Sequence, residues 1–151
     1  MYIANNAKAL KGLKGMSLED QLNLTKRGID VVNSHQRENY YQYGKLLIGH
    51  FNMVRKHSGY TAKCLLEEKG LSLIQSHTHR GGSSYKRDFA DSKVAYENFC
   101  LCDLNPPYCQ LPNWQQGFST IHKDTKTDFF KVTQVEIVKY RILYGNRIYK
   151  A

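Results

Sequence analysis

The spacing of apolar and polar residues predicts two helices in the first half of the chain. In both segments an N-cap residue precedes the apolar positions and a glycine follows them, which is typical of a complete helix. The predicted helices lie at 17–28, with Ser17 as cap and Gly28 as stop, and at 60–69, with Ser58 as cap and Gly70 as stop.

Short runs rich in β-branched and aromatic residues predict strands around and after the second helix. The predicted strands lie at 29–32, 45–50, 71–76, 94–102, 117–122, 130–143 and 147–149; turns or loops are predicted at 40–44, 81–84, 103–107 and 123–128. Strand–helix–strand order followed by a run of strands predicts a layered α/β (α+β) fold with about two helices and six to seven strands.

Two of the predicted strands end in histidine. His50 follows the strand at 45–50, and the strand at 71–76 leads into His77-Thr78-His79-Arg80. Side chains in extended backbone alternate, so His77 and His79 are expected to point to the same side. Because a helix lies between the two strands, we expect them to run parallel and to release both segments at one edge of a sheet. The sequence therefore predicts that His50, His77 and His79 gather there.

Three imidazoles at one edge are suited to binding zinc, manganese or iron, with Arg80 beside them to contact a phosphate. The alternative is that each histidine is an ordinary hydrogen-bonded surface residue, which is the interpretation preferred for His35, His57 and His122. For the group of three, the ligand interpretation is preferred. A two-metal phosphoesterase site also needs bridging carboxylates, and no Asp-x-His, Gly-Asp or Asn-His pair precedes His50.

The formal charge of +9 favours anionic partners, including nucleic acid. The lysines and arginines are scattered rather than clustered, so a purely solubilising role is the alternative. No stretch has the length and composition of a membrane span or a signal peptide, which predicts a cytoplasmic protein without a membrane partner.

Four cysteines are present, at positions 64, 100, 102 and 109. Cys100, Cys102 and Cys109 together could bind zinc, but their spacing matches no zinc-ribbon pattern. Because Cys100 and Cys102 fall in a predicted strand, reduced structural thiols are the preferred interpretation.

Several motifs in one order give the chain a specific likeness to a known family. From about position 28 onward, it resembles the C-terminal half of a calcineurin-like metallophosphoesterase, in particular the compact phage-type members. The motifs that carry this resemblance are Gly49-His50-Phe51-Asn52, Val54-Arg55-Lys56-His57-Ser58-Gly59-Tyr60, Ser76-His77-Thr78-His79-Arg80, Cys100-Leu101-Cys102-Asp103-Leu104-Asn105-Pro106 and Pro112-Asn113-Trp114-Gln115-Gln116-Gly117-Phe118.

The resemblance implies a fold and a set of site residues. It implies half of a sandwich of packed sheets, organised as one domain over 1–151 with a helical lead-in at 1–27 and a family-like core at 28–151. It also implies that His50 and His77 are metal ligands and that His79 completes the shell of a second metal. Asn52 and Arg80 would approach the substrate phosphate.

The departures from the family pattern predict a loss of independent activity. The carboxylate-bearing segments of the family's N-terminal half are absent from these residues. Three glycines of the family are also replaced, by Phe51, Ser76 and Phe99. Glycine at such positions permits positive φ or close backbone approach, which phenylalanine tolerates badly, and a phenyl ring could close the site.

Two functions are consistent with these observations. In the first, the chain is a truncated metallophosphoesterase that keeps the histidine side of a two-metal site, is inactive alone, and is completed by a separate N-terminal half or a second copy. The metal would be divalent Mn, Zn or Fe. In the second, the basic chain with its eleven tyrosines is a non-catalytic, phage-encoded inhibitor that binds a host protein or nucleic acid in the host cytoplasm.

Overall fold

A computed structural model of the protein describes residues 18–31 and 40–150. The chain divides into two units, Met1–Asn33 and Ser34–Ala151. The described elements of the first unit are α2 (Leu18–Gln21) and the 3-10 helix η2 (Thr25–Arg27). Gly28 ends η2 in a left-handed conformation, with φ of 67°, and its N–H donates to the carbonyl oxygen of Thr25. The helix predicted at 17–28 is not continuous, because α2 ends at Gln21 and a turn at 22–24 precedes η2. Gly28 does end the helical segment as predicted, and Ser17 lies outside the described residues.

The second unit contains the remaining elements and confirms the α+β class. Within the described residues the protein has two α-helices and nine strands, more strands than the sequence predicts. The elements of this unit are β1 (Tyr40–Tyr43), β2 (Leu46–Gly49), α3 (Tyr60–Lys69), β3 (Ser72–Gln75), β4 (Gly81–Arg87), β5 (Ser92–Asn98), β6 (Gly117–Lys123), β7 (Phe130–Glu136), β8 (Arg141–Tyr144) and β9 (Arg147–Lys150).

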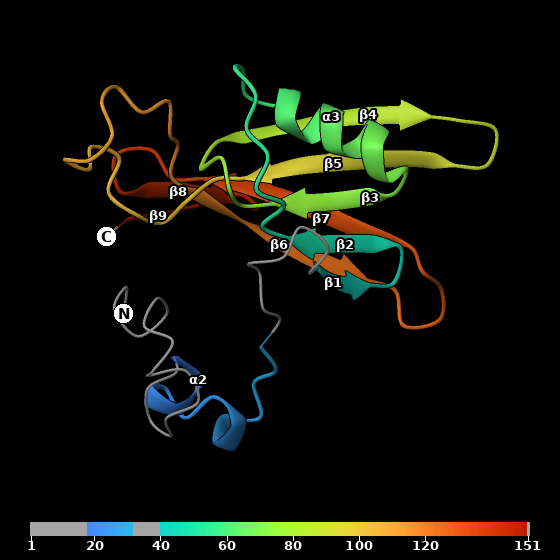
Figure 1. The fold of residues 1–151 in the computed structure, drawn as a ribbon, viewed down its shortest axis with the longest axis horizontal. Helices are drawn as coiled ribbons and strands as arrows, with labels where there is room; N and C mark the ends of the chain where they lie inside the picture. Colours follow the sequence, from blue (N-terminus) through green and yellow to red (C-terminus); the bar gives the residue numbers. More distant parts are fainter. Residues whose placement is uncertain (1–17, 32–39, 151) are drawn as a thin grey trace, which may run out of the picture. The chain divides into compact units, whose positions relative to one another are not determined.

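A five-stranded sheet with the order β1-β2-β3-β5-β4 forms the centre of this unit (Figure 1). The strands β2, β3 and β5 run parallel, and β1 and β4 pair antiparallel at the two edges. The predicted parallel arrangement of the two histidine-bearing strands, with a helix between them, is therefore confirmed. The other strands form two hairpins, β6–β7 and β8–β9.

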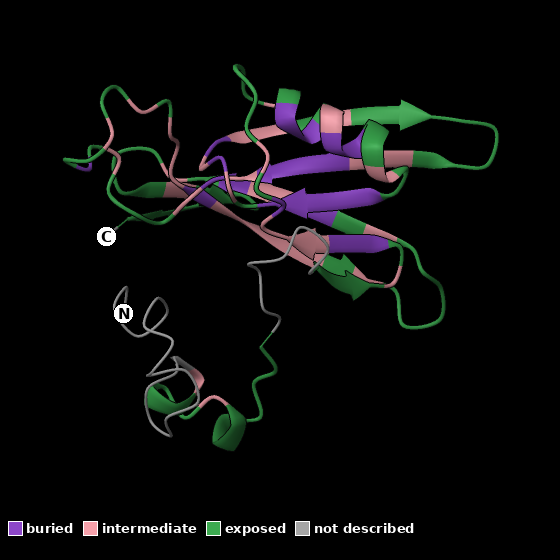
Figure 2. Ribbon diagram, viewed as in Figure 1, coloured by how far each residue is buried: buried purple, intermediate pink, exposed green. Residues whose placement is uncertain are grey.

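Strict alternation along the parallel strands builds a core on each face of the sheet. On one face, Leu47, Leu73 and Ala95 pack with Leu65 and Leu66 of α3. Their sequence neighbours point to the other face, where they pack against the β6–β7 hairpin; this second cluster consists of Leu46, Ile74, Tyr96 and Val132. Figure 2 shows the burial concentrated on the central strands and on the inner side of α3. Burying both faces explains why β2 begins as a continuous apolar run and why even Ser72 and Gln75 of β3 are buried.

Several predicted boundaries were wrong, for local reasons. The predicted turn at 40–44 is the edge strand β1 followed by a tight turn at Gly44, and the glycine-rich loop predicted at 81–84 is the start of β4. The single strand predicted at 130–143 is interrupted between β7 and β8, where Lys139 and Tyr140 have positive φ. The strand predicted at 94–102 ends at Asn98, and the described residues at 29–31 form no strand.

A buried carboxylate, rather than the predicted Ser58, caps helix α3. The N-cap residue is Gly59, and no side chain next to it in sequence makes a capping hydrogen bond. Instead, Oε1 of Glu97 on β5 accepts hydrogen bonds from the backbone N–H groups of Thr61 and Ala62, at 3.0 and 3.2 Å. A negative charge at this position also interacts favourably with the helix dipole. The cap therefore ties α3 to the central sheet.

The same carboxylate organises the segment that follows β3. Oε2 of Glu97 accepts a hydrogen bond from the Thr78 hydroxyl at 2.9 Å and lies 3.5 Å from Nε of Arg80. The Arg80 guanidinium also donates to the carbonyl oxygens of Arg55 and Lys56. Glu97 is fully buried and Arg80 is 5% exposed. A buried charge pair is tolerated best when further hydrogen bonds satisfy its partners, and here they satisfy both carboxylate oxygens and both terminal nitrogens of the guanidinium, while Nε of Arg80 has only the ion-pair contact.

We predict that Glu97→Ala destabilises the fold severely. It leaves the Arg80 guanidinium buried without its counter-charge and removes the cap of α3, a combination expected to cost about 3–5 kcal/mol of unfolding free energy. Urea denaturation followed by circular dichroism measures the loss. Glu67→Ala, on the exposed side of α3, is the matched control and should change stability by no more than about 0.5 kcal/mol. A loss below about 1 kcal/mol for Glu97→Ala would contradict the role assigned to this carboxylate.

Candidate metal centre

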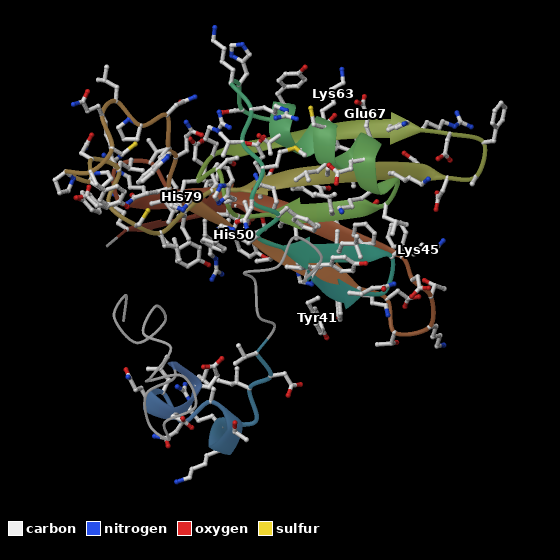
Figure 3. The ribbon with its side chains drawn as sticks, in the orientation of Figure 1. Tyr41, Lys45, His50, Lys63, Glu67 and His79 are labelled. Atoms are coloured by element: carbon white, nitrogen blue, oxygen red, sulfur yellow. The ribbon has the colours of Figure 1, made fainter. Side chains whose placement is uncertain are left out.

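The three predicted histidines lie where neighbouring parallel strands end. His50 directly follows β2, and His77 and His79 lie in the segment after β3. Figure 3 places His50 and His79 at one end of the strands and Lys45, at the start of β2, at the other. Thr78 is buried and the flanking His77 and His79 are partly exposed. The burial alternates although the backbone is not extended: β3 ends at Gln75, residues 77–78 form a turn, and His79 has φ of 57°. The inward position of Thr78 comes from its hydrogen bond to Glu97 rather than from strand alternation.

His50 and His77 form a close pair of imidazoles. Nε2 of His50 lies 3.2 Å from Nδ1 of His77, and the ring centroids are 4.4 Å apart at an interplanar angle of 69°. Two nitrogens bound to one tetrahedral zinc, at bond lengths of about 2.0–2.1 Å, are separated by about 3.3–3.4 Å. The observed separation is close to this value, so the pair can hold one ion with only a small adjustment.

Asn52 orients the first imidazole of this pair. Its side-chain oxygen lies 2.6 Å from Nδ1 of His50. Since a carbonyl oxygen only accepts, Nδ1 of His50 carries the proton and Nε2 presents its lone pair toward His77. Fixing the tautomer of a metal-binding histidine in this way is typical of the residues that support a metal site. The sequence predicted Asn52 as a phosphate contact; its observed contact is with His50.

The electrostatics of the site favour neutral imidazoles. Burial lowers the pKa of His77 below its ordinary value of 6.5, and the nearby His50 and His79 lower it further. Burial and His50 likewise lower the pKa of His79. At neutral pH both rings are therefore uncharged, and the neutral ring is the form that binds metal.

His79 belongs to a second cluster, which the sequence did not predict. Its ring nitrogen and the sulfur atoms of Cys100 and Cys102 all lie within 4.8 Å of one another, so these three side chains can hold a metal ion. The closest pair is Sγ of Cys102 and Nδ1 of His79, at 3.7 Å. Burial raises the pKa of the Cys100 thiol to about 11, with a further increase from its neighbour Cys102. The interpretation of these two cysteines as structural thiols overlooked their position next to His79.

The strand register explains this position. The strands β3 and β5 are parallel neighbours, with Gln75 opposite Glu97, so the segments that follow them emerge side by side. The histidines of one segment and the cysteines of the other are therefore brought to the same sheet edge. The sequence did contain one signal for this cluster, a Cys-x-Cys pair shortly after a strand. It did not show which strand lies next to β3, so the cysteines could not be placed beside His79.

Arg80 lies in the interior rather than at the site surface. The sequence predicted that it would contact a substrate phosphate, but its guanidinium points into the protein toward Glu97 and two backbone carbonyl oxygens. The buried carboxylate draws it inward. Arg80 therefore stabilises the segment that carries the histidines, and its contact with a substrate phosphate stays a prediction.

Two of the three positions at which the family resemblance implies glycine have the backbone conformation that glycine favours. Phe51 has φ of 60° and Phe99 has φ of 53°, both in the left-handed region that L residues rarely adopt. Ser76 is not among the residues with positive φ. The Phe51 ring is buried in the core beneath α3, and a Cβ on Gly81 would lie only 2.0 Å from the Phe99 ring. Both rings thus pack into the protein, and packing offsets the backbone strain.

The comparisons with known proteins give no further guide to this site: the chain matches no family model, no curated protein and no solved structure. Among the described residues, no helix combines the length and the apolar content needed to cross a lipid bilayer. The assignment of function therefore depends on the geometry of the site.

We predict an unusual order of stability for variants at Phe51. The unfolding free energy of Phe51→Gly should equal or exceed that of Phe51→Ala, and the difference should be at most about 1 kcal/mol. The reason is that alanine is strained in the left-handed conformation and glycine is not. Thermal and urea denaturation of the two variants measure the difference. At Val135, which is buried in β7 and does not have positive φ, the order should be reversed by about 0.5–1 kcal/mol. An alanine variant clearly more stable than the glycine variant at Phe51 would show that the strain is absent.

Proposed function

We propose that the protein is a metal-binding protein that supplies the histidine side of a two-metal phosphoester hydrolase site, and that it needs a partner to hydrolyse a substrate. The observation that supports this proposal best is the 3.2 Å approach of His50 Nε2 to His77 Nδ1 at the ends of two adjacent parallel strands. The resemblance of the histidine-bearing segments to calcineurin-like metallophosphoesterases suggests the reaction.

Each residue of the site has a task in this proposal. His50 and His77 hold one ion through neutral imidazoles, and Asn52 keeps the ring of His50 in the required tautomer. The side chain of Gln75 accepts a hydrogen bond from the backbone N–H of His77 at 2.8 Å and donates one to the Thr78 hydroxyl at 2.7 Å. These two bonds fix the segment that carries His77. A bound divalent ion, Mn, Zn or Fe, supplies Lewis acidity toward a phosphoryl oxygen and lowers the pKa of water.

The proposal requires carboxylates from outside the described residues. A bridged pair of ions about 3.5–4 Å apart needs acidic ligands, and Glu97, the buried carboxylate nearest in the network, is already committed to α3 and Thr78. A second copy of the chain or a separately encoded N-terminal half would supply them. We therefore expect no phosphoesterase activity from the chain alone.

The alternative is a non-catalytic binding protein, and the surface of the β8–β9 hairpin favours it. Large apolar side chains on and beside this hairpin are exposed, among them Tyr140 at 76%, Leu143 at 67% and Ile148 at 65%. Exposed apolar residues gathered in one region indicate contact with another molecule. The same surface would also serve the partner required by the first proposal, so metal binding is the property that separates the two.

We predict that the purified chain binds zinc through the histidine pair. His77→Ala should weaken binding at this site by at least about 100-fold, because losing a ligand exceeds the 10–100-fold effect of losing a supporting residue. Asn52→Ala should weaken it by about 10–100-fold. Equilibrium dialysis with metal analysis measures both effects.

The matched control is His122→Ala, an exposed histidine on β6, which should bind zinc as the unmodified chain does. A phosphodiester such as bis(4-nitrophenyl) phosphate tests activity in parallel, with no turnover expected above that of free zinc. Zinc binding that is indifferent to both His50→Ala and His77→Ala would refute the proposal and favour the binding protein. Turnover by the chain alone that depends on His77 would instead show that no partner is required.

A further inference from the structure

We propose that His79, Cys100 and Cys102 form a second, thiolate-rich metal site that binds zinc, distinct from the His50–His77 pair. The proposal goes beyond the proposed function, since it stands on a different set of ligand atoms and on a different preference for metal. It requires neither a phosphoester substrate nor a partner.

The distances fit one tetrahedral ion. Zinc bonds of about 2.3 Å to sulfur and 2.0–2.1 Å to nitrogen place a nitrogen and a sulfur about 3.6 Å apart, and two sulfurs about 3.8 Å apart. Cys102 Sγ lies 3.7 Å from His79 Nδ1, and the three ligand atoms all lie within 4.8 Å of one another. The separations are therefore at or near those of three ligands on one tetrahedral ion.

The backbone holds the two ligand segments against each other before any ion is present. The carbonyl oxygen of His79 accepts the N–H of Gln115 at 3.0 Å, and the carbonyl oxygen of Gln115 accepts the N–H of Cys100 at 3.1 Å. The side chain of Gln116 donates to the carbonyl oxygen of Cys102 at 3.0 Å. Residues 115–116 are thus hydrogen-bonded to both segments that carry the ligands. Because these segments are already ordered, little conformational entropy is lost when a metal ion binds.

An aromatic side chain packs against the imidazole of His79 and limits its orientation. The ring of Trp114 meets that of His79 edge to face, with centroids 4.5 Å apart. The backbone of His79 itself is left-handed, with φ of 57°, a conformation that an ordinary loop would relax. The position of this imidazole is therefore determined by its neighbours rather than by its own preference.

The ligand chemistry selects zinc over the harder metals. Two sulfur ligands and one imidazole suit zinc, whereas manganese and magnesium prefer oxygen ligands. Binding releases two thiol protons to solvent, and the resulting two thiolates neutralise the dication. Three protein ligands leave a fourth position, and a hollow of about 360 Å³ beside the cluster, lined in part by Ser76, Asn98 and Phe118, gives access to it.

Cobalt substitution tests this site directly. Addition of Co²⁺ to the reduced chain should produce the intense near-ultraviolet absorption of a cobalt–thiolate bond, which imidazole and carboxylate ligands do not give. Cys102→Ser, His79→Ala and Cys100→Ser should each weaken this signal strongly and lower zinc affinity at the site by at least about 100-fold. Cys64→Ser, in α3, is the matched control and should keep the full signal.

Each of the two proposed sites can be removed by mutation without removing the other. His50→Ala should leave the cobalt–thiolate absorption intact while removing the histidine-pair site, and Cys102→Ser should do the reverse. Because Cys102 is exposed, its replacement leaves the core untouched. X-ray absorption of the zinc-loaded His50→Ala variant should show two sulfur atoms at about 2.3 Å. A shell of only nitrogen and oxygen atoms, or a thiolate signal that survives Cys102→Ser, would overturn the proposal.

Discussion

The buried carboxylate of Glu97 is the interaction on which the arrangement of this protein depends. It accepts hydrogen bonds from the first turn of α3 and from Thr78, and it faces the guanidinium of Arg80, all among buried residues. A buried charge is costly unless it is fully satisfied, so each of these partners must be in place for the fold to be stable. One side chain thereby fixes the position of the helix relative to the sheet and the conformation of the histidine-bearing segment.

The hydrogen bonds of Glu97 also determine the geometry of the histidine site. Thr78 and Arg80 are buried, whereas His77 and His79, at the intervening positions, are partly exposed. Gln75 also holds this segment, by hydrogen bonding to both Thr78 and the backbone N–H of His77. The side chains of Gln75, Thr78 and Glu97 are thus buried while the imidazoles of His77 and His79 remain accessible. Such buried support favours a preorganised ligand site over a set of unrelated surface histidines.

The sequence predicted the parts of this structure that local patterns determine. Helix α3 at 60–69 and the parallel placement of β2 and β3 followed from apolar spacing and from the helix that connects two strands. It could not predict what depends on contacts distant in the chain. The cap of α3 comes from a residue 36 positions away from Thr61, so Ser58 was the natural but wrong choice. The buried position of Arg80 could not be predicted, because nothing nearby in sequence shows that Glu97 lies beside it. The cluster of His79, Cys100 and Cys102 was missed because neither local sequence shows that β3 and β5 are neighbouring strands.

The left-handed phenylalanines mark where the backbone beside the candidate site is strained. Phe51 and Phe99 both have a positive φ, and their rings fill space that small neighbours leave open: Gly81 and Gly117 against Phe99, and Gly49 against Phe51. The strain costs about 1–2 kcal/mol per position and is offset by apolar burial. Because Phe51 follows His50 and Phe99 precedes Cys100, the packing of the two phenyl rings also fixes the backbone that carries these candidate ligands.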